Sequence, residues 1–512
     1  MPMKTLHLFS RRKIQLEKFS KFFCVCLIVA GFTSCADGFE DDEKFSSSVT
    51  NTQLESPDAS KVKMTNSTDD KGNPQVTIEW PVVYGAGGYQ FSFYNVDDPD
   101  NPVSVGEEDQ LVDGCSAVRP TQEDTKYEVV IWALGSEKYN NKTAVTPTEV
   151  AYTTLVPSVA VIPDGSDLAE YFAANPIAKS DSEQAFELEA GGSYTLNGVL
   201  DLGLNWITLR GDKIDHPKLT YGIDGRLITK SGLKLKFMDI DCSALSSGSS
   251  TSSLLLLNSD PASLPTAGTG GYYFIEKEIA IQSCNISGLN KYLLYDNNVK
   301  YTLKTFRIQD CVVAINSSSG ETIYMQGGGI CDLYFIQNTF YGLVPSSSSF
   351  FIRYNNSARP TTDRLGFISG SFNIYNNTFY NVVSNGQMGN YSGMNHANTK
   401  LNLTRNLFVN CGDKYVIRRM SGGTNMARTL IYNCYWYDGG FAEGEEMGHS
   451  QGDNATANKA APATGYYDTP TFAGPVNDPD PTKVNFTVVS STEGLILNNQ
   501  AGDPRWLPST EE

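Results

Sequence analysis

The feature that most constrains this chain of 512 residues is a short phrase that recurs through its second half. Each copy alternates apolar and polar residues, then reaches Asn, Asp or Ser before a small or apolar residue. The copies end at Cys242, Cys284, Cys311, Thr339, Thr378, Leu407 and Cys434, at intervals of 42, 27, 28, 39, 29 and 27 residues. A regular short interval with two longer ones is typical of one coil per repeat with occasional loop insertions.

Period-two alternation that ends in turn residues indicates strands, so the coil is built from strands and not from helices. One such unit cannot bury its apolar side alone, but stacked units share a core through parallel pairing. We therefore predict an all-β fold with a right-handed parallel β-helix over residues 233–455. Leucine-rich repeats are the competing solenoid, but their Leu-x-x-Leu-x-Leu pattern at shorter spacing is absent from the sequence.

The start of the chain predicts export. A basic stretch precedes the apolar run Phe22–Ala30, which is too short to span a bilayer as a mature helix, so residues 1–34 are the expected signal. The sequence Gly31-Phe-Thr-Ser-Cys35 resembles a bacterial lipobox with Phe32 in place of the usual Leu, which makes Cys35 the expected lipidation site. An ordinary signal with a chance Cys is the alternative. The acidic tether 35–51 resembles the surface-export tag of Bacteroidota lipoproteins, which implies the outer face of the outer membrane.

Net charge excludes one class of partner and limits another. The formal charge is −18, and it becomes −23 from Cys35 onward because the signal carries six basic residues and one acid. Nucleic acid is excluded as a ligand, since phosphate binding needs a basic face. A polyanion such as pectin would be repelled too, unless Arg and Lys cluster locally or Ca²⁺ bridges carboxylates.

Seven cysteines follow Cys35, an odd number without metal-ligand spacing. Four of them occupy what looks like the same place in the phrase: Cys242, Cys284, Cys311 and Cys434. We predict that these stack as small buried residues and that they form no disulfide framework. The Asn-Thr pairs of the phrase are expected to be turn residues with ladder hydrogen bonds.

Residues 52–156 predict a separate small β-sandwich. Alternating runs such as Val76–Trp80 and Tyr127–Ala133 are joined by turn-rich segments. Trp80, and the approach from Pro120 to Tyr127, resemble the buried Trp and tyrosine corner of a fibronectin type III domain, although the stretch between Pro120 and Tyr127 is longer than usual. Such a domain would space the working domain from the membrane; sugar binding by the sandwich itself is the alternative.

Residues 157–232 are expected to form the N-terminal cap and first coils, with a short helix at Leu168–Ala174. Glu189-Ala-Gly-Gly-x-Tyr194 and Ile207-Thr-Leu-Arg-Gly211, with the later Asn-Asn-Thr-Phe coils, resemble the pectate-lyase-like superfamily. Residues 456–512, an expected C-terminal cap that contains Gly502-Asp-Pro-Arg-Trp506, resemble the end of a poorly characterised Bacteroidota lipoprotein family of that fold. The resemblance implies a role in polysaccharide utilisation, often of pectin, with outer-membrane glycan-uptake proteins as candidate partners.

The sequence can be compared with the catalytic residues of two enzyme classes, a Ca²⁺-dependent lyase and a polygalacturonase. A Ca²⁺-dependent lyase needs a cluster of carboxylates and a basic residue; Asp239, Asp241 and Asp310 end strands in comparable places, and Arg353 and Arg418 are the candidate bases. The turn interpretation of these Asp residues competes, because later copies carry Asn there. Polygalacturonases on this fold use an Asp pair, Gly-His-Gly and Arg-Ile-Lys, which are absent, so a glycosidase carboxylate pair has no visible place.

Aromatic, amide and guanidinium groups in the later loops suit sugar binding, since aromatic faces stack on sugar rings and Arg binds carboxylates. The candidate substrate-binding residues are Arg353, Tyr354, Arg359, Tyr391, His396, Arg418 and Trp436, of which Trp436 has a core or cap role as its alternative. The sequence predicts a surface lipoprotein whose β-helix groove binds polysaccharide, with pectic galacturonan favoured. A pectate lyase with an Arg base and Ca²⁺ and an adhesin without a glycan ligand are the alternatives. The insertions behind the intervals of 42 and 39 residues are where function is expected.

Overall fold

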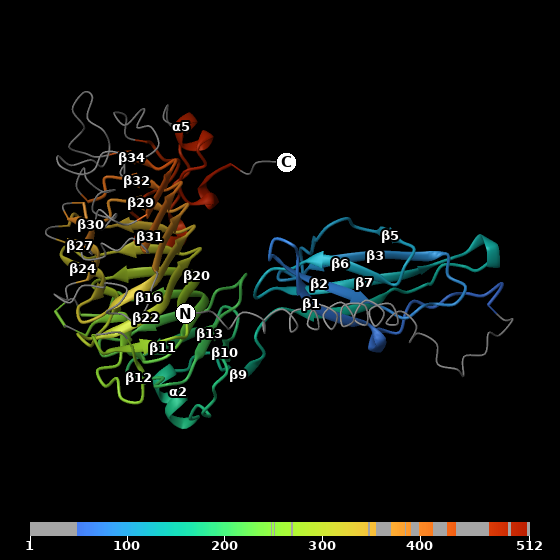
Figure 1. Cartoon of the computed structure of the whole chain (residues 1–512), viewed down its shortest axis with the longest axis horizontal. Coiled ribbons are helices and arrows are strands. Elements are labelled where there is room, and N and C mark those ends of the chain that lie inside the picture. Colours follow the sequence, from blue (N-terminus) through green and yellow to red (C-terminus); the bar gives the residue numbers. More distant parts are fainter. Residues whose placement is uncertain are drawn as a thin grey trace, which may run out of the picture. The chain divides into compact units, whose positions relative to one another are not determined.

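A computed structural model of the chain describes residues 49–246, 248–249, 251–267, 270–346, 349–354, 370–384, 386–390, 399–412, 427–436, 470–489 and 493–508. The chain divides between Thr154 and Leu155 into two compact units, close to the predicted boundary after residue 156. The first unit is built from antiparallel sheets and the second from long parallel sheets (Figure 1). The all-β prediction, a β-sandwich followed by a parallel β-helix, is confirmed.

The first unit packs two antiparallel sheets. One has the order β1-β2-β6, with strands Lys63–Thr68, Pro74–Glu79 and Ser116–Pro120. The other has the order β4-β3-β7-β8, and β5 pairs with β3; in chain order its strands are Gly88–Asn95 (β3), Val103–Ser104 (β4), Gln110–Val112 (β5), Lys126–Leu134 (β7) and Thr148–Thr153 (β8). Two 3₁₀ helices, η1 (Ala59–Lys61) and η2 (Glu137–Tyr139), lie outside the sheets.

Alternation along the strands builds the core of this sandwich, because successive side chains point to opposite faces. Strand β7 alternates buried and half-buried residues from Tyr127 to Leu134. Trp80 is 4% exposed and stacks on Phe91 at a centroid distance of 5.5 Å. The Tyr127 hydroxyl accepts a hydrogen bond from the backbone N–H of Gln122 at 2.6 Å, which ties the chain between β6 and β7 to the strand that follows it.

The second unit winds through three sheets. Sheet 1 holds β9 (Ser158–Ile162), β10 (Gln184–Leu188), β13 (Ile207–Arg210), β22 (Tyr301–Gln309), β25 (Gly329–Ile336), β28 (Gly370–Tyr375), β31 (Thr399–Thr404) and β33 (Ala427–Ile431). Sheet 2 holds β11 (Ser193–Leu196), β14 (Lys218–Tyr221), β23 (Val312–Ile315), β26 (Thr339–Gly342), β29 (Thr378–Tyr380), β32 (Leu407–Val409) and β34 (Cys434–Trp436). Sheet 3 holds β12 (Val199–Asp201), β15 (Arg226–Thr229), β17 (Ser253–Leu257), β21 (Tyr292–Tyr295), β24 (Gly320–Met325), β27 (Ser349–Tyr354) and β30 (Gln387–Asn390).

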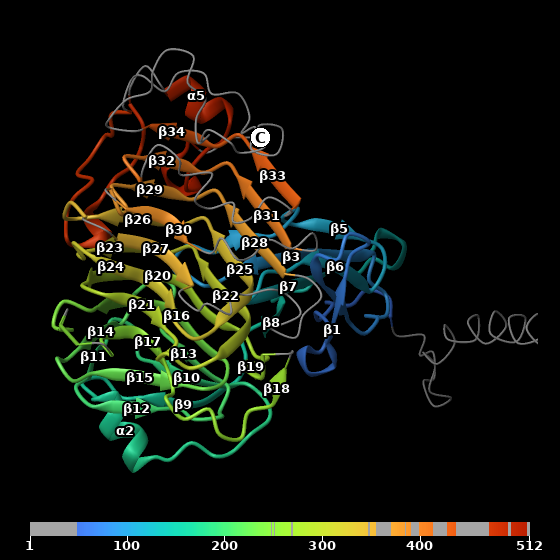
Figure 2. The same ribbon diagram turned by 60° about the vertical axis from the view of Figure 1, so that its left-hand side comes forward.

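Two long strands, β16 (Leu233–Asp241) and β20 (Ile279–Leu289), pass from sheet 1 into sheet 2 and pair in both. Every pairing between successive coils is parallel within the described strands, apart from the β18–β19 hairpin (Thr266–Ala267 and Tyr272–Ile275). This hairpin lies in the first of the two predicted insertions. Figure 2 shows the coils stacked in chain order from α2 to β34.

Each coil turns from sheet 1 to sheet 2 at one residue in the left-handed conformation. The φ angles at these corners lie between 50° and 57°, at Phe237, Ser283, Asp310, Gln337, Asn376, Arg405 and Tyr432. Left-handed residues other than Gly are uncommon, so their recurrence in seven coils marks a fixed corner geometry. Asp310 is therefore a corner residue.

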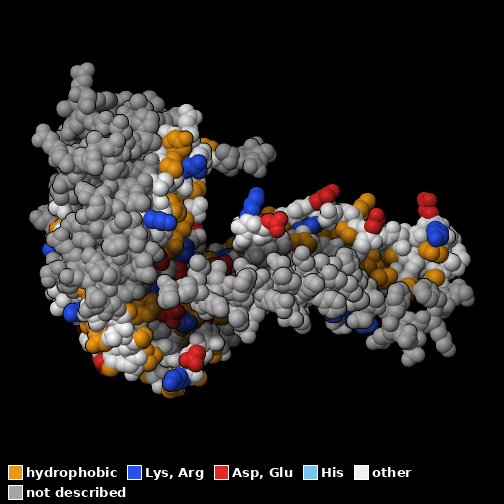
Figure 3. Space-filling view, in the orientation of Figure 1, with side chains coloured by type: hydrophobic (Ala, Val, Ile, Leu, Met, Phe, Trp, Pro, Cys, Tyr) orange, Lys and Arg blue, Asp and Glu red, His pale blue; other side chains and the backbone are white. Residues whose placement is uncertain are grey.

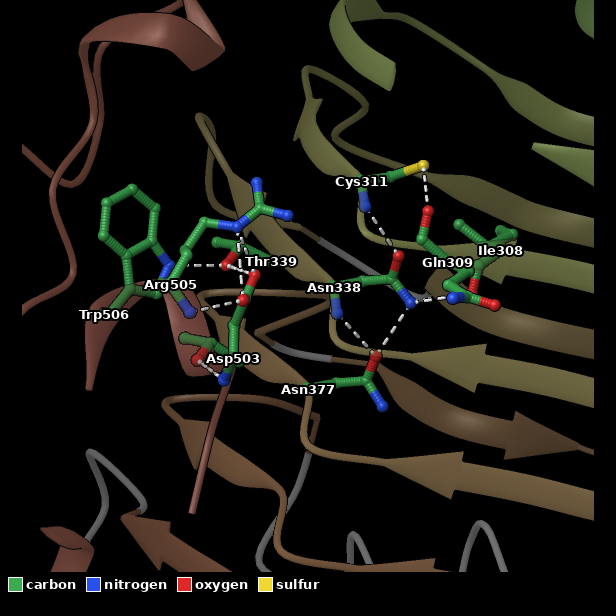
Figure 4. Close-up of polar contacts among 10 residues, drawn as sticks. Ile308, Gln309, Cys311, Asn338, Thr339, Asn377, Asp503, Arg505 and Trp506 are labelled. Atoms are coloured by element: carbon green, nitrogen blue, oxygen red, sulfur yellow. Dashed lines mark hydrogen bonds and ion pairs between the residues drawn. The ribbon is translucent and has the colours of Figure 1, made fainter. Parts of the chain in front are cut away.

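The residue after each corner points into the coil. Hydrogen bonds join consecutive coils there: the Asn377 side-chain oxygen accepts from both nitrogens of Asn338, and the Asn406 side-chain oxygen accepts from both nitrogens of Asn377. Asn433 continues this ladder at one end. At the other end, the Cys311 N–H donates to the Asn338 side-chain oxygen at 2.9 Å (Figure 4). The predicted ladder role of the Asn residues is confirmed.

The predicted cysteine stack is wrong in part. The seven cysteines after Cys35 are thiols that form no disulfide, but only Cys284 and Cys311 share the inward position that the asparagines fill in later coils. Cys434 comes one residue later, in register with Leu407. Met238 stands in register with Cys284, so Cys242 lies four residues beyond the inward position of its coil.

A short helix begins the solenoid where the sequence predicts it. α2 (Leu168–Ala174) starts at Asp167, whose side chain accepts from the Glu170 N–H, and it buries Leu168 and Phe172 against the first coil. In the motif that ends at Tyr194, the hydroxyl accepts from the Glu189 N–H at 2.8 Å and donates to the Ile162 carbonyl at 2.8 Å. The motif thus joins the first two coils.

The end of the chain forms a lateral cover, which we call the C-terminal strap (residues 470–489 and 493–508). It contains η3 (Pro481–Lys483), α5 (Glu493–Asn498) and η4 (Pro504–Trp506). Its apolar residues pack on the outer face of sheet 2, Phe486 near Tyr341 and Ile496 near Leu407. The described part of the expected cap therefore covers a side of the solenoid. Among described residues no helix combines the length and apolarity needed to cross a membrane.

Candidate functional site

An open groove of about 510 Å³ lies on the outer face of sheet 2, beside the strap. Its floor comes from strands β14, β16 and β20, and one wall is the strap segment 479–482. We call it the sheet 2 groove. Its volume falls in the range of small-ligand sites, roughly 300–1,000 Å³.

Parallel register places its polar residues in two rows. Lys218, Asp239 and Asn285 are level with one another on three neighbouring strands. Two residues further along, Asp241 is level with Ser287. The residues between them are buried, because neighbours along a strand face opposite sides. Asp239 and Asp241 therefore share the outer face and lie in one groove.

The carboxylates of the groove are held by donors. The Asp239 Oδ1 atom accepts from Asn285 Nδ2 at 2.8 Å and lies 3.2 Å from His216 Nδ1. Asp241 pairs with Lys218 Nζ at 3.3 Å and accepts from the N–H and hydroxyl of Ser243. Burial opposes the charged form of Asp241, but hydrogen bonds from Ser243 and Lys218 outweigh it and lower the pKa of this carboxyl.

The two carboxylates on the groove floor, Asp239 and Asp241, therefore act as fixed hydrogen-bond acceptors. A glycosidase needs one carboxyl of the pair with a raised pKa, to serve as the acid. The pKa of Asp241 is shifted the other way. The arrangement is suited to accepting hydrogen bonds from hydroxyl groups.

Asp310, the third predicted Ca²⁺ ligand, does not join Asp239 and Asp241. It occupies the corner of its coil, and Gln309 Nε2 donates to it at 3.1 Å. Burial raises the pKa of its carboxyl, against the effect of Arg505. Within the part of the chain that the structure describes, no group of three or more His, Cys, Asp or Glu residues could hold a metal ion.

The two predicted residues on β27 face opposite ways. Arg353 lies outward on sheet 3, where Nη1 is 2.6 Å from Glu321 Oε1 and the guanidinium lies 4.4 Å from the Phe350 ring centroid. Tyr354 is 4% exposed, belongs to the core and packs edge-on against Phe372. Its predicted role in sugar contact is wrong, because adjacent strand residues point to opposite faces and Arg353 takes the outer one.

Several predicted site residues lie outside the described residues: Cys35, Arg359, Tyr391, His396 and Arg418. Trp436 ends β34, but its side chain is also outside the description. Their predicted roles stay predictions.

Sequence reasoning missed Lys218, Asn285 and Ser287. The signal that could have found them is the polar, apolar, polar pattern directly after the corner, as in Asp239-Ile-Asp241 and Asn285-Ile-Ser287. In later coils the same outward positions hold Val312 and Ala314, or Leu407 and Val409. The groove is therefore marked by outward residues that differ from coil to coil, and not by the residues that recur.

Space-filling of the described atoms shows acidic and basic side chains interspersed, with no continuous basic stripe on the visible face (Figure 3).

Three domain models match successive stretches of the chain, and each describes a domain of unknown function. DUF4992 matches residues 3–192, DUF4957 matches residues 192–342 and DUF5123 matches residues 372–506. No curated protein and no solved structure matches the chain. The first match ends just before β11, so it contains the sandwich and the first solenoid strands. The chain thus combines three domains of unknown function, of which the second contains the floor of the sheet 2 groove.

Proposed function

We propose that this protein binds polysaccharide through the sheet 2 groove. The observation that carries the proposal is the row of fixed polar side chains on the groove floor, with Lys218, Asp239, Asp241 and Asn285 held by one another or by neighbours. Sugar hydroxyls donate and accept hydrogen bonds, and fixed partners lower the ordering cost of binding them. Pro479 and Pro481 add an apolar wall beside these groups.

The charge of the groove bears on which polysaccharide it holds. Three carboxylates, Asp239, Asp241 and Asp480, lie along it, and both Lys218 and Lys483 are already paired with one of them. A neutral glycan meets no repulsion there. Pectic galacturonan, the class favoured by the sequence resemblance, would need Ca²⁺ to bridge its carboxylates to those of the protein.

The test is affinity electrophoresis and calorimetry of the purified protein with galactan, arabinan, hydroxyethyl cellulose and polygalacturonate, the last with and without Ca²⁺. Ser287→Trp fills the groove and is expected to weaken binding about tenfold or more, because a bulky ring displaces the ligand. Thr65→Trp, on an exposed position of β1, is the matched control. Unchanged binding by Ser287→Trp would contradict the groove as the binding site. Release of unsaturated uronate from polygalacturonate would show that the protein is a lyase.

We further propose that the chain is a lipoprotein anchored at Cys35 and displayed on the outer membrane, where the sandwich spaces the solenoid from the bilayer. The two-sheet arrangement and the Tyr127 hydrogen bond to Gln122 support a likeness of the sandwich to fibronectin type III domains. Outer-membrane glycan-uptake proteins are the candidate partners. Mass spectrometry of the mature N-terminus tests the anchor: a diacylated Cys35 supports it, and cleavage at another residue contradicts it.

A further inference from the structure

A second polar surface lies on the outer face of sheet 1. Parallel register places Arg307, Tyr334, Asn373 and Asn402 level with one another on β22, β25, β28 and β31. Tyr375 lies two residues beyond Asn373 on the same side of β28. We call Tyr334, Asn373, Tyr375 and Asn402 the Tyr–Asn face. Strand alternation puts it outside, while Phe335 and Ile374 point into the core.

Hydrogen bonds fix this face. The Asn373 Oδ1 atom accepts from Asn402 Nδ2 at 2.7 Å and from the Tyr375 hydroxyl at 2.8 Å. Asn373 Nδ2 donates to Ser371 Oγ at 2.9 Å, and Ser371 donates on to Asp332 at 2.8 Å. The network connects three coils, so its side chains are ordered before any ligand arrives and little entropy is lost on binding.

Each of the two tyrosines is held by a contact to a neighbouring polar side chain. The Tyr375 hydroxyl reaches a residue two positions back on its own strand, which requires the ring to lie along the strand. Arg307 places its guanidinium 4.5 Å from the Tyr334 ring centroid. Both tyrosines are half-buried, so part of each residue reaches solvent. Partly exposed aromatic residues fixed on the outer face of a sheet are suited to stacking on sugar rings.

The charge of the Tyr–Asn face limits the class of ligand that it can bind. Arg307 Nε lies 2.8 Å from Glu278 Oε1, so its charge is compensated. Asp332 and the exposed Lys400 are both level with Ser371, and their opposite charges offset each other. A polyuronate or a nucleic acid would find no net positive surface there. A neutral ligand with many hydroxyls meets amide, hydroxyl and carboxylate partners without repulsion.

We propose that the Tyr–Asn face binds a neutral, linear polysaccharide laid along the solenoid axis. Neighbouring strands are about 4.8 Å apart. That spacing is close to the length of one sugar unit in an extended chain, so each coil can contact one sugar. The proposal rests on the proposed function in that both surfaces hold glycan, and it adds a second site on a different sheet with a stated preference for neutral chains.

The test compares the two surfaces in the full-length purified protein, with hydroxyethyl cellulose, galactan and arabinan as neutral probes and polygalacturonate as the acidic one. The double variant Tyr334→Ala/Tyr375→Ala is expected to raise the Kd for a neutral probe about tenfold or more, because two stacking surfaces are lost. Asn402→Ala, at the half-buried end of the network, should weaken binding in the same direction without touching a ring. Tyr84→Ala, at a sandwich residue that is 43% exposed, is the control.

Each outcome separates this site from the groove. Binding that is lost in Ser287→Trp but unchanged in all face variants would overturn the Tyr–Asn face and leave the proposed function standing. Binding that weakens in face variants and survives in Ser287→Trp supports the face and counts against the groove. No binding to any probe by the unchanged protein overturns both. A face variant that weakens polygalacturonate binding as much as neutral binding contradicts the stated preference.

Discussion

The two ends of sheet 2 have the same backbone and opposite outer faces. At β14, β16 and β20 the outward residues are charged or amide-bearing, as at Lys218, Asp239 and Asn285, and the groove stays open. From β23 to β34 the outward residues include Val312 and Leu407, and the strap covers them. The same solenoid thus offers one half of a sheet to a ligand and gives the other half to its own C-terminus.

The inner corner changes between the same two ends. The early coils fill the position after the corner with Met238, Cys284 and Cys311, and the later coils fill it with the asparagine ladder from Asn338 to Asn433. Where the strap covers the sheet (Figure 4), Asp503 accepts from Thr339 Oγ1 at 2.8 Å and Trp506 Nε1 donates to the same hydroxyl at 2.7 Å. At the inward position after the corner, the later coils are joined by a polar network, whereas the early coils have Met or Cys there.

The largest expected effect is on the asparagine ladder. Asn377→Ala removes the acceptor of Asn338 and the donor to Asn406, so buried polar groups in two neighbouring coils lose partners. We expect a loss of about 4–6 kcal/mol in the free energy of unfolding of the β-helix, because unsatisfied buried groups are costly. Urea unfolding measures it, with Asn316→Ala at an exposed position as the control. If Asn377→Ala lowers the free energy of unfolding no more than Asn316→Ala does, the asparagine ladder does not stabilise the later coils as described.

Next in size is the strap. Phe486 is 1% exposed and packs against Tyr341 and Tyr380. Phe486→Ala should cost about 3–4 kcal/mol, as large-to-small core changes do, and should loosen the strap more than the coils. Hydrogen exchange of peptides from residues 470–489 measures the loosening. Because residues 479–482 form a groove wall, glycan binding should weaken as well. If the strap loosens and glycan binding stays intact, the strap does not contribute to the binding groove.

The covered half contains a buried carboxyl, Asp503, whose pKa is raised, whereas the pKa of Asp241 in the open half is lowered. Burial raises the pKa of Asp503 from 3.8 to about 6, against the effects of Arg505 and Thr339. A raised folded-state pKa means that the folded protein binds the proton more tightly between about pH 4 and pH 6, so this group's contribution to stability falls as pH rises through that window.

Asp503→Asn should therefore flatten the profile, with a change of about 3 kcal/mol in the difference between variant and parent from pH 4 to pH 7. Urea midpoints across this range give the measurement. Asp296, whose pKa burial also raises to about 6, is present in both proteins and cancels in the difference. Parallel profiles for variant and parent would show that Asp503 does not titrate as described.

The smallest effect is expected in the open half. Cys284 is 1% exposed and occupies the position that Asn fills later. Cys284→Ala should cost only about 1 kcal/mol, since it removes one small buried group and leaves few polar partners unsatisfied. A cost equal to that of Asn377→Ala in the same urea assay would show that both halves depend equally on this position.

The sequence predicted the fold because strand alternation and turn residues recur locally. It misplaced Cys434 because the phrases were aligned by their last residue; the structural constant is the inward residue, Asn433 in that coil and Cys284 in an earlier one. The corner itself carries no single residue type, since Phe237 and Arg405 adopt the same left-handed conformation. Local pattern therefore predicts the coil more reliably than its register.

The groove was harder to predict because it joins distant parts of the chain. Asp239 and Asp241 could be placed on one face from their spacing, but the wall at residues 479–482 comes from a segment more than two hundred residues later. Tyr354 was misplaced for a different reason: the aromatic residues of a solenoid fill its core as often as its surface, and only the register of β27 decides which. Long-range docking and strand register are the two facts that local sequence does not contain.

The central claim is that the open half of sheet 2 is where a polysaccharide binds. Hydrogen-exchange mass spectrometry of the protein with and without a bound neutral glycan tests it most directly. The account predicts slower exchange in peptides that contain β16 and β20, at residues 233–241 and 279–289. Slower exchange confined to the sandwich at residues 52–154, with these strands unchanged, would contradict it.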